Sequence, residues 1–136
     1  MSSVHGTSVV QERKDGFFFG GTFWMDFVAD NGKSITVFAA GPNKESFPVI
    51  DQQADTVTIT TTFVGIQEKV SITGGPTLIR DAGTVTFVDV FEYTGDPENP
   101  IGDQISNDVV GLHGPHPILL SDTGFCGVVE PYLLDP

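Results

Sequence analysis

The sequence predicts an all-β fold, and three observations support that prediction. Apolar and polar residues alternate with a period of two in several segments, which is the pattern of a strand with two different faces. Asn31 and Gly32 lie between two such segments, where an Asn-Gly pair favours a tight hairpin turn. No segment has a convincing helical period with capping residues. We therefore expect roughly seven or eight short strands. They are predicted to form an antiparallel β-barrel of about eight strands or, alternatively, a two-sheet β-sandwich.

The chain has a length that suits one domain. Its 136 residues, 39% of them hydrophobic, are enough for one packed core. We therefore predict a single all-β domain over residues 1–136. Residues 1–14, MSSVHGTSVVQERK, are mostly polar and are expected to form a flexible N-terminal segment.

The first strand is predicted in GFFFGGTFWMDFV, residues 16–28. One of its faces is apolar and carries Phe17, Phe19, Phe23, Met25 and Phe27. The opposite face is only partly polar and carries Phe18, Thr22, Trp24, Asp26 and Val28. A type I′ turn at Asn31 and Gly32 is expected to lead into the return strand, KSITVFAA.

Three further segments predict the central strands. In TVTITTTFV, residues 56–64, β-branched residues favour a pleated backbone, and a short link separates this segment from EKVSIT. After a Gly-Gly break, TLIRDAG is a weak candidate for a single helical turn. GTVTFVDVFEY, residues 83–93, is a long strand. Asp89 falls in its apolar phase, so either a bulge shifts the register or both faces of the strand are covered.

The C-terminal third has weaker signals. TGDPENPIGDQISND, residues 94–108, is rich in Gly, Pro and acidic residues and is expected to be a loop. Three short strand candidates follow, VVGLH, HPILL and FCGVVEPYLL. Pro131 places the last of these at a sheet edge or ends it.

The charge balance excludes several partners. The net charge is −12, which disfavours nucleic acid and anionic membrane surfaces as partners. The single cysteine, Cys126, allows no intrachain disulfide and is expected to be a small buried apolar residue. The sequence has no recognisable signal peptide or transmembrane segment, so a cytoplasmic location is expected. No cofactor is indicated.

Two of the three histidines lie in LHGPHPIL, residues 112–119. His113 and His116 have the spacing of a helical pair, but Pro115 and Pro117 disfavour a helix, and no second ligand pair completes a metal set. A proline-stiffened corner is therefore favoured over a metal site at the His-Gly-Pro-His stretch. If the corner lies at the mouth of a cavity, either histidine can act as an acid or base, as can Asp89.

The second apolar face carries two function hypotheses. Such a face needs a cover, supplied by a partner subunit, by a neighbouring loop or by an apolar ligand. The first hypothesis is a binding or cyclase-like barrel, with a small apolar ligand held by Trp24, Phe63, Phe87, Phe91 and Tyr93. The second is a structural module that buries this face in a homo-oligomer. Metal-dependent chemistry at the histidine pair is a third hypothesis.

The stretch VSITGGPTLIRDAGTVTF, residues 70–87, resembles a segment of the allene-oxide-cyclase and dirigent β-barrels. The matching residues are Ile72, Thr73, Gly74, Gly75, Ala82, Gly83 and Val85. Pro76 stands where those families have a small hydroxyl residue, and the excursion between the strands is one residue shorter. The resemblance implies an eight-stranded barrel that holds an apolar molecule and carries out cofactor-free cyclisation or guides radical coupling. It covers about an eighth of the chain, and no catalytic residue transfers.

Overall fold

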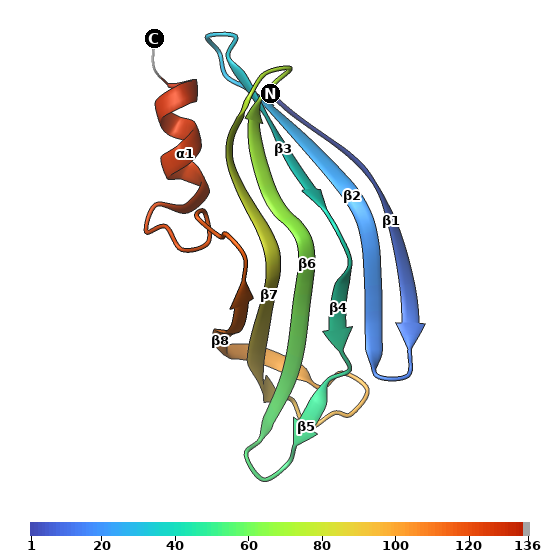
Figure 1. Ribbon diagram of the computed structural model, residues 1–136. Coiled ribbons are helices and arrows are strands. Elements are labelled where there is room, and N and C mark those ends of the chain that lie inside the picture. The colour runs from blue at the N-terminus through green and yellow to red at the C-terminus, as the bar shows by residue number, and fades with distance from the viewer. Residues whose placement is uncertain (135–136) are drawn as a thin grey trace.

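The computed structural model describes residues 1–134, in which it has eight β-strands and one α-helix (Figure 1). The elements are β1 (Ser2–Arg13), β2 (Gly16–Val28), β3 (Ser34–Ala40), β4 (Asn43–Ser46), β5 (Val49–Asp51), β6 (Thr56–Ile72), β7 (Thr77–Tyr93), β8 (Ile101–His113) and α1 (Gly124–Leu133). Most of the chain is therefore antiparallel β-sheet, which confirms the all-β prediction.

All eight strands belong to one sheet. Its order is β1-β2-β3-β6-β7-β8, and every neighbouring pair is antiparallel. β4 continues the position of β3, because it also lies between β2 and β6, and β5 pairs with β6. β1 and β8 are therefore the two end strands of this order. The first 14 residues, expected to be flexible, contain β1, which pairs with β2 along its whole length.

The hairpin of β2 and β3 is confirmed, but its turn differs from the prediction. Phe27 pairs with Ile35, so the apolar faces of the two strands coincide. The Gly32 N–H donates to the Ala29 carbonyl at 2.9 Å. Gly32 has a φ of 84°, whereas Asn31 does not have the positive φ that a type I′ turn requires. The loop is therefore one residue longer, with a type I turn that ends at a left-handed glycine.

β6 and β7 form a longer hairpin than the sequence predicts. β6 joins the two predicted strands TVTITTTFV and EKVSIT, and β7 includes TLIRDAG, which is extended rather than helical. The two strands pair along almost their whole length and are joined by a turn in which the Gly75 N–H donates to the Ile72 carbonyl. Pairing over this length keeps residues 77–83 extended despite their weak strand pattern.

The C-terminal third departs furthest from the sequence predictions. β8 takes in residues 101–108, which were expected to be loop, and the candidate HPILL forms turns. The predicted strand FCGVVEPYLL is instead helix α1. Phe125, Val129 and Leu133 are spaced by four residues, a spacing that fits one face of a helix as well as one face of a strand. Cys126 is exposed on this helix rather than buried.

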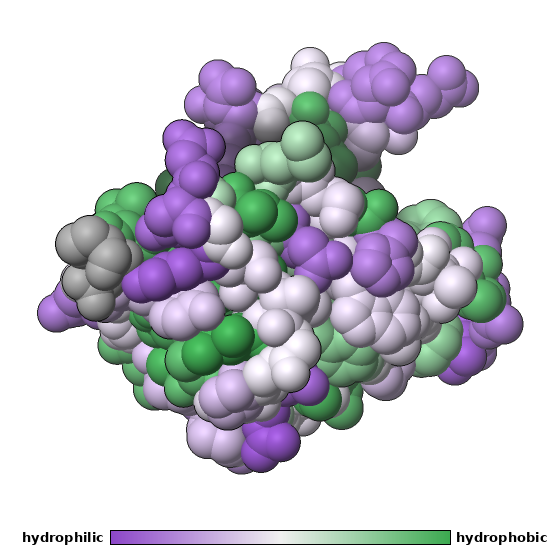
Figure 2. Space-filling view, turned by 90° about the horizontal axis from the view of Figure 1, so that it is seen from above, coloured by the Kyte–Doolittle hydropathy of each residue, from purple (hydrophilic) through white to green (hydrophobic). Residues whose placement is uncertain are grey.

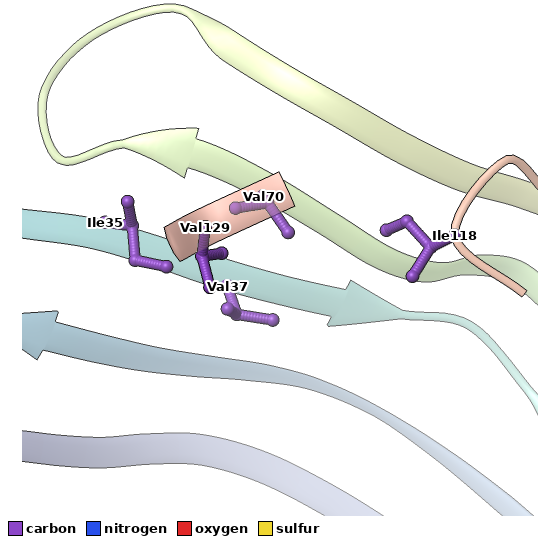
Figure 3. Close-up of a cluster of buried hydrophobic side chains, with 5 residues drawn as sticks. All are labelled: Ile35, Val37, Val70, Ile118 and Val129. Carbon is purple, nitrogen blue, oxygen red and sulfur yellow. The ribbon is translucent and has the colours of Figure 1, made fainter. Parts of the chain in front are cut away.

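The core lies between the sheet and α1. Figure 3 shows its five buried side chains, contributed by β3, β6, α1 and the loop before α1: Ile35, Val37, Val70, Val129 and Ile118. Met25 and Phe27 of β2 pack against this cluster. The sheet face that carries these residues is here called the inner face. Seen from the α1 end, apolar residues still reach the surface between polar ones (Figure 2), so this core is small.

Candidate functional site

Closely packed glycines mark the place where the sheet bends. Gly65 of β6 pairs with Gly83 of β7, and their φ angles are 107° and 129°, values that residues with a Cβ rarely adopt. A Cβ on Gly83 would collide with the carbonyl oxygen of His113. Similar lack of space is found at Gly6, Gly21, Gly41 and Gly114. β6 and β7 bend near their middles (Figure 1), as glycine kinks allow. The inner face is hollow beside this bend.

A cavity of about 930 Å³ occupies this hollow. Its floor comes from β1, β2, β3, β6 and β7, and one side comes from the chain before and within α1. Much of its wall is aromatic or aliphatic and includes Phe19, Phe23, Phe63, Val85, Phe87 and Phe125. Phe63 and Phe87 meet edge to face with their ring centroids 5.8 Å apart. The cavity therefore has an apolar wall built from strands far apart in the sequence.

Two carboxyl groups form part of the polar wall. Glu68 and Asp81 are cross-strand partners on β6 and β7, and both line the cavity. Asp81 is buried and accepts hydrogen bonds from the backbone N–H groups of Ile118 and Leu119, at 2.8 and 2.9 Å. Glu68 is half-buried, and burial, together with the charge of Asp81, raises the pKa of its carboxyl group.

His116 lies in the same wall and is only 2% exposed. Its Nε2 lies 3.0 Å from the carbonyl oxygen of His113. A carbonyl oxygen can only accept a hydrogen bond, so Nε2 carries the proton and Nδ1 of the neutral ring is an acceptor. Nδ1 is buried without a hydrogen-bond partner.

Gln67 presents a second unpartnered acceptor. The β6–β7 register shifts between Ile66 and Glu68, which leaves Gln67 as a bulged residue. Its Nε2 donates to the carbonyl oxygen of Gly83 at 3.1 Å, while its Oε1 is buried without a partner. Glu68 shares the inner face with Val70, and the bulge puts it on the same face as Phe63, which lies five residues earlier on β6.

Three of the sequence-predicted residues line the cavity: Phe63, Phe87 and His116. Trp24 lies on the opposite face of the sheet, between His5 and Phe38, with ring centroids 5.4 and 5.2 Å away. There it lines a separate hollow of about 300 Å³ with Lys69. It therefore does not join the apolar wall of the larger cavity.

The other predicted site residues lie elsewhere on β7 and β8. Phe91 and Tyr93 lie near the C-terminal end of β7 and do not line the cavity. Asp89 keeps the inner phase of β7 and accepts hydrogen bonds from side chains of Gln104 and Asn107 on β8, whose bulges lie nearby. His113 ends β8 and is exposed.

The HGPH stretch makes a corner between β8 and the loop that leads to α1. The Pro115 carbonyl accepts a hydrogen bond from the Ala82 N–H at 2.9 Å, which fixes the corner against β7. The ring of His116 is hydrogen-bonded to the backbone carbonyl of His113, which is not the arrangement of two imidazole rings that share a metal ion. Across residues 1–134, no group of three or more His, Cys, Asp or Glu side chains is placed to hold a metal ion.

The sequence patterns did not predict Glu68, Asp81 or Gln67 as residues of the site. A signal for Asp81 was present, because it shares the apolar phase of Val85 and Phe87, just as Asp89 does. The interpretation of TLIRDAG as a helical turn hid that phase. Glu68 gave no such signal, because a bulge that no residue pattern announces separates it from Phe63.

Comparisons with protein-family models, with curated proteins and with solved structures find no match for this chain. The resemblance of residues 70–87 to the allene-oxide-cyclase and dirigent barrels therefore remains a prediction from that stretch alone. In the part of the chain that the structure describes, no helix is long and apolar enough to cross a membrane.

Proposed function

We propose that this protein binds a small, largely apolar ligand in the cavity on the inner face of the sheet. The cavity carries the proposal, because its volume of about 930 Å³ falls within the usual range of small-molecule sites and its wall is rich in aromatic rings. In this proposal the curved sheet is the wall of an open β-barrel, in which β1 and β8 do not pair with each other and alternate residues of each strand face the enclosed space.

The exposure of the wall supports a ligand. Phe23 is 37% exposed although it lies in the inner phase of β2, and Phe19 and Phe87 are only partly buried. A ligand seated among these rings would remove apolar surface from water, which is favourable by about 25 cal/mol for each Å². The polar groups Glu68, Asp81 and His116 would then orient the ligand.

Titration with a neutral solvatochromic dye such as Nile red tests the proposal. We expect saturable binding of one dye per chain, with emission shifted to the blue by the apolar wall. Phe23→Gln, which introduces an amide into the cavity, should weaken binding. Phe18→Gln is the matched control, because Phe18 lies on the same strand but outside the cavity, against Arg13. Absence of saturable binding, or equal loss in both folded variants, would contradict the proposal.

Self-assembly is the second candidate function, and the two ends of the sheet favour it. Every residue of β1 is exposed, and so is most of β8, although both strands carry large apolar side chains. The most exposed of these are Val4, Val9, Val10, Ile105 and Val110. Strand edges with free backbone groups pair readily with other chains. Sedimentation at high protein concentration should then show an oligomer, and a strict monomer would exclude this candidate.

A further inference from the structure

The charges around the cavity are all of one sign. Glu68 and Asp81 line it, and the described residues that line it include no lysine or arginine. Lys69, the neighbour of Glu68 in sequence, points to the outer face, where its Nζ lies 5.1 Å from the centre of the Phe38 ring. Lysine and arginine therefore supply no charge in the described cavity wall to balance the two carboxyl groups, and its basic side chains are the imidazoles of His5 and His116.

The unpartnered polar atoms of the wall are also of one kind. His116 Nδ1 in the neutral ring and Gln67 Oε1 are both hydrogen-bond acceptors, buried and without partners. Neither has a donor among residues 1–134, and a buried acceptor without a partner lowers stability. A ligand that supplies hydrogen-bond donors would complement this wall, whereas a ligand that supplies only acceptors would not.

We propose that the cavity takes an apolar molecule bearing a protonated primary amine, with the ammonium group among Glu68, Asp81 and His116. This inference rests on the proposed function and specifies its ligand class. An ammonium group offers three donors and one positive charge, which match the acceptors and the two carboxyl groups. The raised pKa of Glu68 agrees, because it reports a carboxylate whose charge burial disfavours and no nearby cation offsets.

An anionic amphiphile is the opposite case. The carboxylate of a fatty acid would bring a third negative charge beside Glu68 and Asp81 and would offer no donor to His116 Nδ1. An alcohol of the same chain length would offer one donor and no charge. The three head groups on one alkyl chain therefore separate the contribution of the polar wall from that of the apolar wall.

Displacement of Nile red by 1-aminodecane, 1-decanol and decanoate tests the inference at neutral pH. We expect the amine to bind more tightly than the alcohol by about tenfold or more, the factor for one charge-assisted hydrogen bond. Decanoate should bind most weakly. Glu68→Gln should remove most of the amine's advantage, whereas Glu92→Gln, at an exposed position of β7 outside the cavity, should keep it.

The possible outcomes distinguish the inference from the proposed function. If decanoate displaces the dye as well as the amine does, or if Glu68→Gln changes nothing, the inference is wrong while dye binding still supports an apolar site. If 1-aminodecane fails to displace bound Nile red, the inference is likewise wrong, while dye binding still supports an apolar site. If the dye itself does not bind, both proposals are wrong.

Discussion

Asp81 shows how one buried carboxylate can position a whole segment. Its two oxygens accept the N–H groups of Ile118 and Leu119, which lie 37 and 38 residues away in sequence. Those bonds hold the turn after His116 against β7, so that Ile118 reaches the core and His116 reaches the cavity wall. Hydrogen bonds to a charged group contribute roughly 1.5–3 kcal/mol each. The cavity wall on this side therefore depends on the Asp81 carboxyl group.

Glu68 predicts a pH dependence of stability with a definite sign. The folded protein raises the pKa of its carboxyl group above the ordinary value of 4.5, through burial and through the charge of Asp81. Ionisation therefore costs more in the folded state than in the unfolded state. That cost is absent below the unfolded pKa, grows as the pH rises above it, and is complete above the folded pKa.

The variant Glu68→Gln, which cannot ionise, should therefore gain stability relative to the parent as the pH rises from 4 to 8. Urea unfolding at several pH values measures this gain. The other titratable groups of this wall, His5, Asp81 and His116, are present in both proteins. Glu92→Gln should show no such trend. A gain that is constant with pH would mean that the Glu68 carboxyl group titrates as it does in the unfolded chain.

At the scale of elements, alternation and turn residues predict pairing better than they predict breaks in pairing. The β2–β3 hairpin follows from the alternation of Phe27 and its neighbours and from Gly32. The strand candidate VVGLH is the C-terminal part of β8, but residues 101–108 could not be found in this way, because an edge strand exposed on both sides needs no apolar face. α1 was missed because a spacing of four satisfies both periods, and only docking onto β3 decides between them.

Residues of the candidate site were predictable from the sequence only in strand segments where apolar and polar residues alternate without a break. Phe63 and Phe87 lie in the apolar phase of unbroken strand segments, so the sequence placed them on one face and the structure places them in contact. Trp24 was assigned to the same wall, but its phase belongs to the other face. Glu68 depends on a bulge at Gln67, and a shift of one residue moves a side chain to the opposite face.

Gly83 provides the test of the bend. Gly83→Ala would force a Cβ into a φ of 129° and against the His113 carbonyl oxygen. The backbone strain alone costs about 1–3 kcal/mol, and the collision adds to it. We expect a lower urea midpoint and weaker Nile red binding, because the β7–β8 contact beside the cavity must open.

Gly111→Ala is the control for this variant. Gly111 lies on β8 without a positive φ, and its Cβ would meet Thr86 at 3.4 Å, an ordinary contact. The free energy of unfolding should therefore change little. Equal effects of the two alanine substitutions on stability would show that glycine at position 83 is not needed for the bend.

At the scale of the whole molecule, the chain exposes more surface than a folded monomer of its size. It exposes 8348 Å², whereas a monomer of 14.5 kDa is expected to expose about 6,900 Å². The difference, about 1,500 Å², exceeds the roughly 800 Å² that each partner buries in a standard interface. A ligand in the cavity covers part of the inner face, but it leaves the outer edges of β1 and β8 open. The two candidate functions are therefore compatible.

Salt concentration should reveal contacts between these edges. Each chain carries a net charge of −12, so copies repel one another at low ionic strength. Screening shortens the range of that repulsion from about 10 Å at 0.1 M salt to about 3 Å at 1 M, whereas contacts between apolar side chains persist. We therefore expect the oligomer population, measured by sedimentation, to rise with sodium chloride concentration.

The double variant Val10→Lys, Val110→Lys separates edge pairing from charge. Both side chains are exposed, one on β1 and one on β8, at 59% and 61%. The two lysines reduce the negative charge and so weaken repulsion between copies, but lysine on an edge strand also opposes strand pairing. If the edges form the contact, the variant should associate less than the parent at every salt concentration. Stronger association of the variant, or dissociation of the parent by salt, would show instead that charge controls assembly and that these edges remain unpaired.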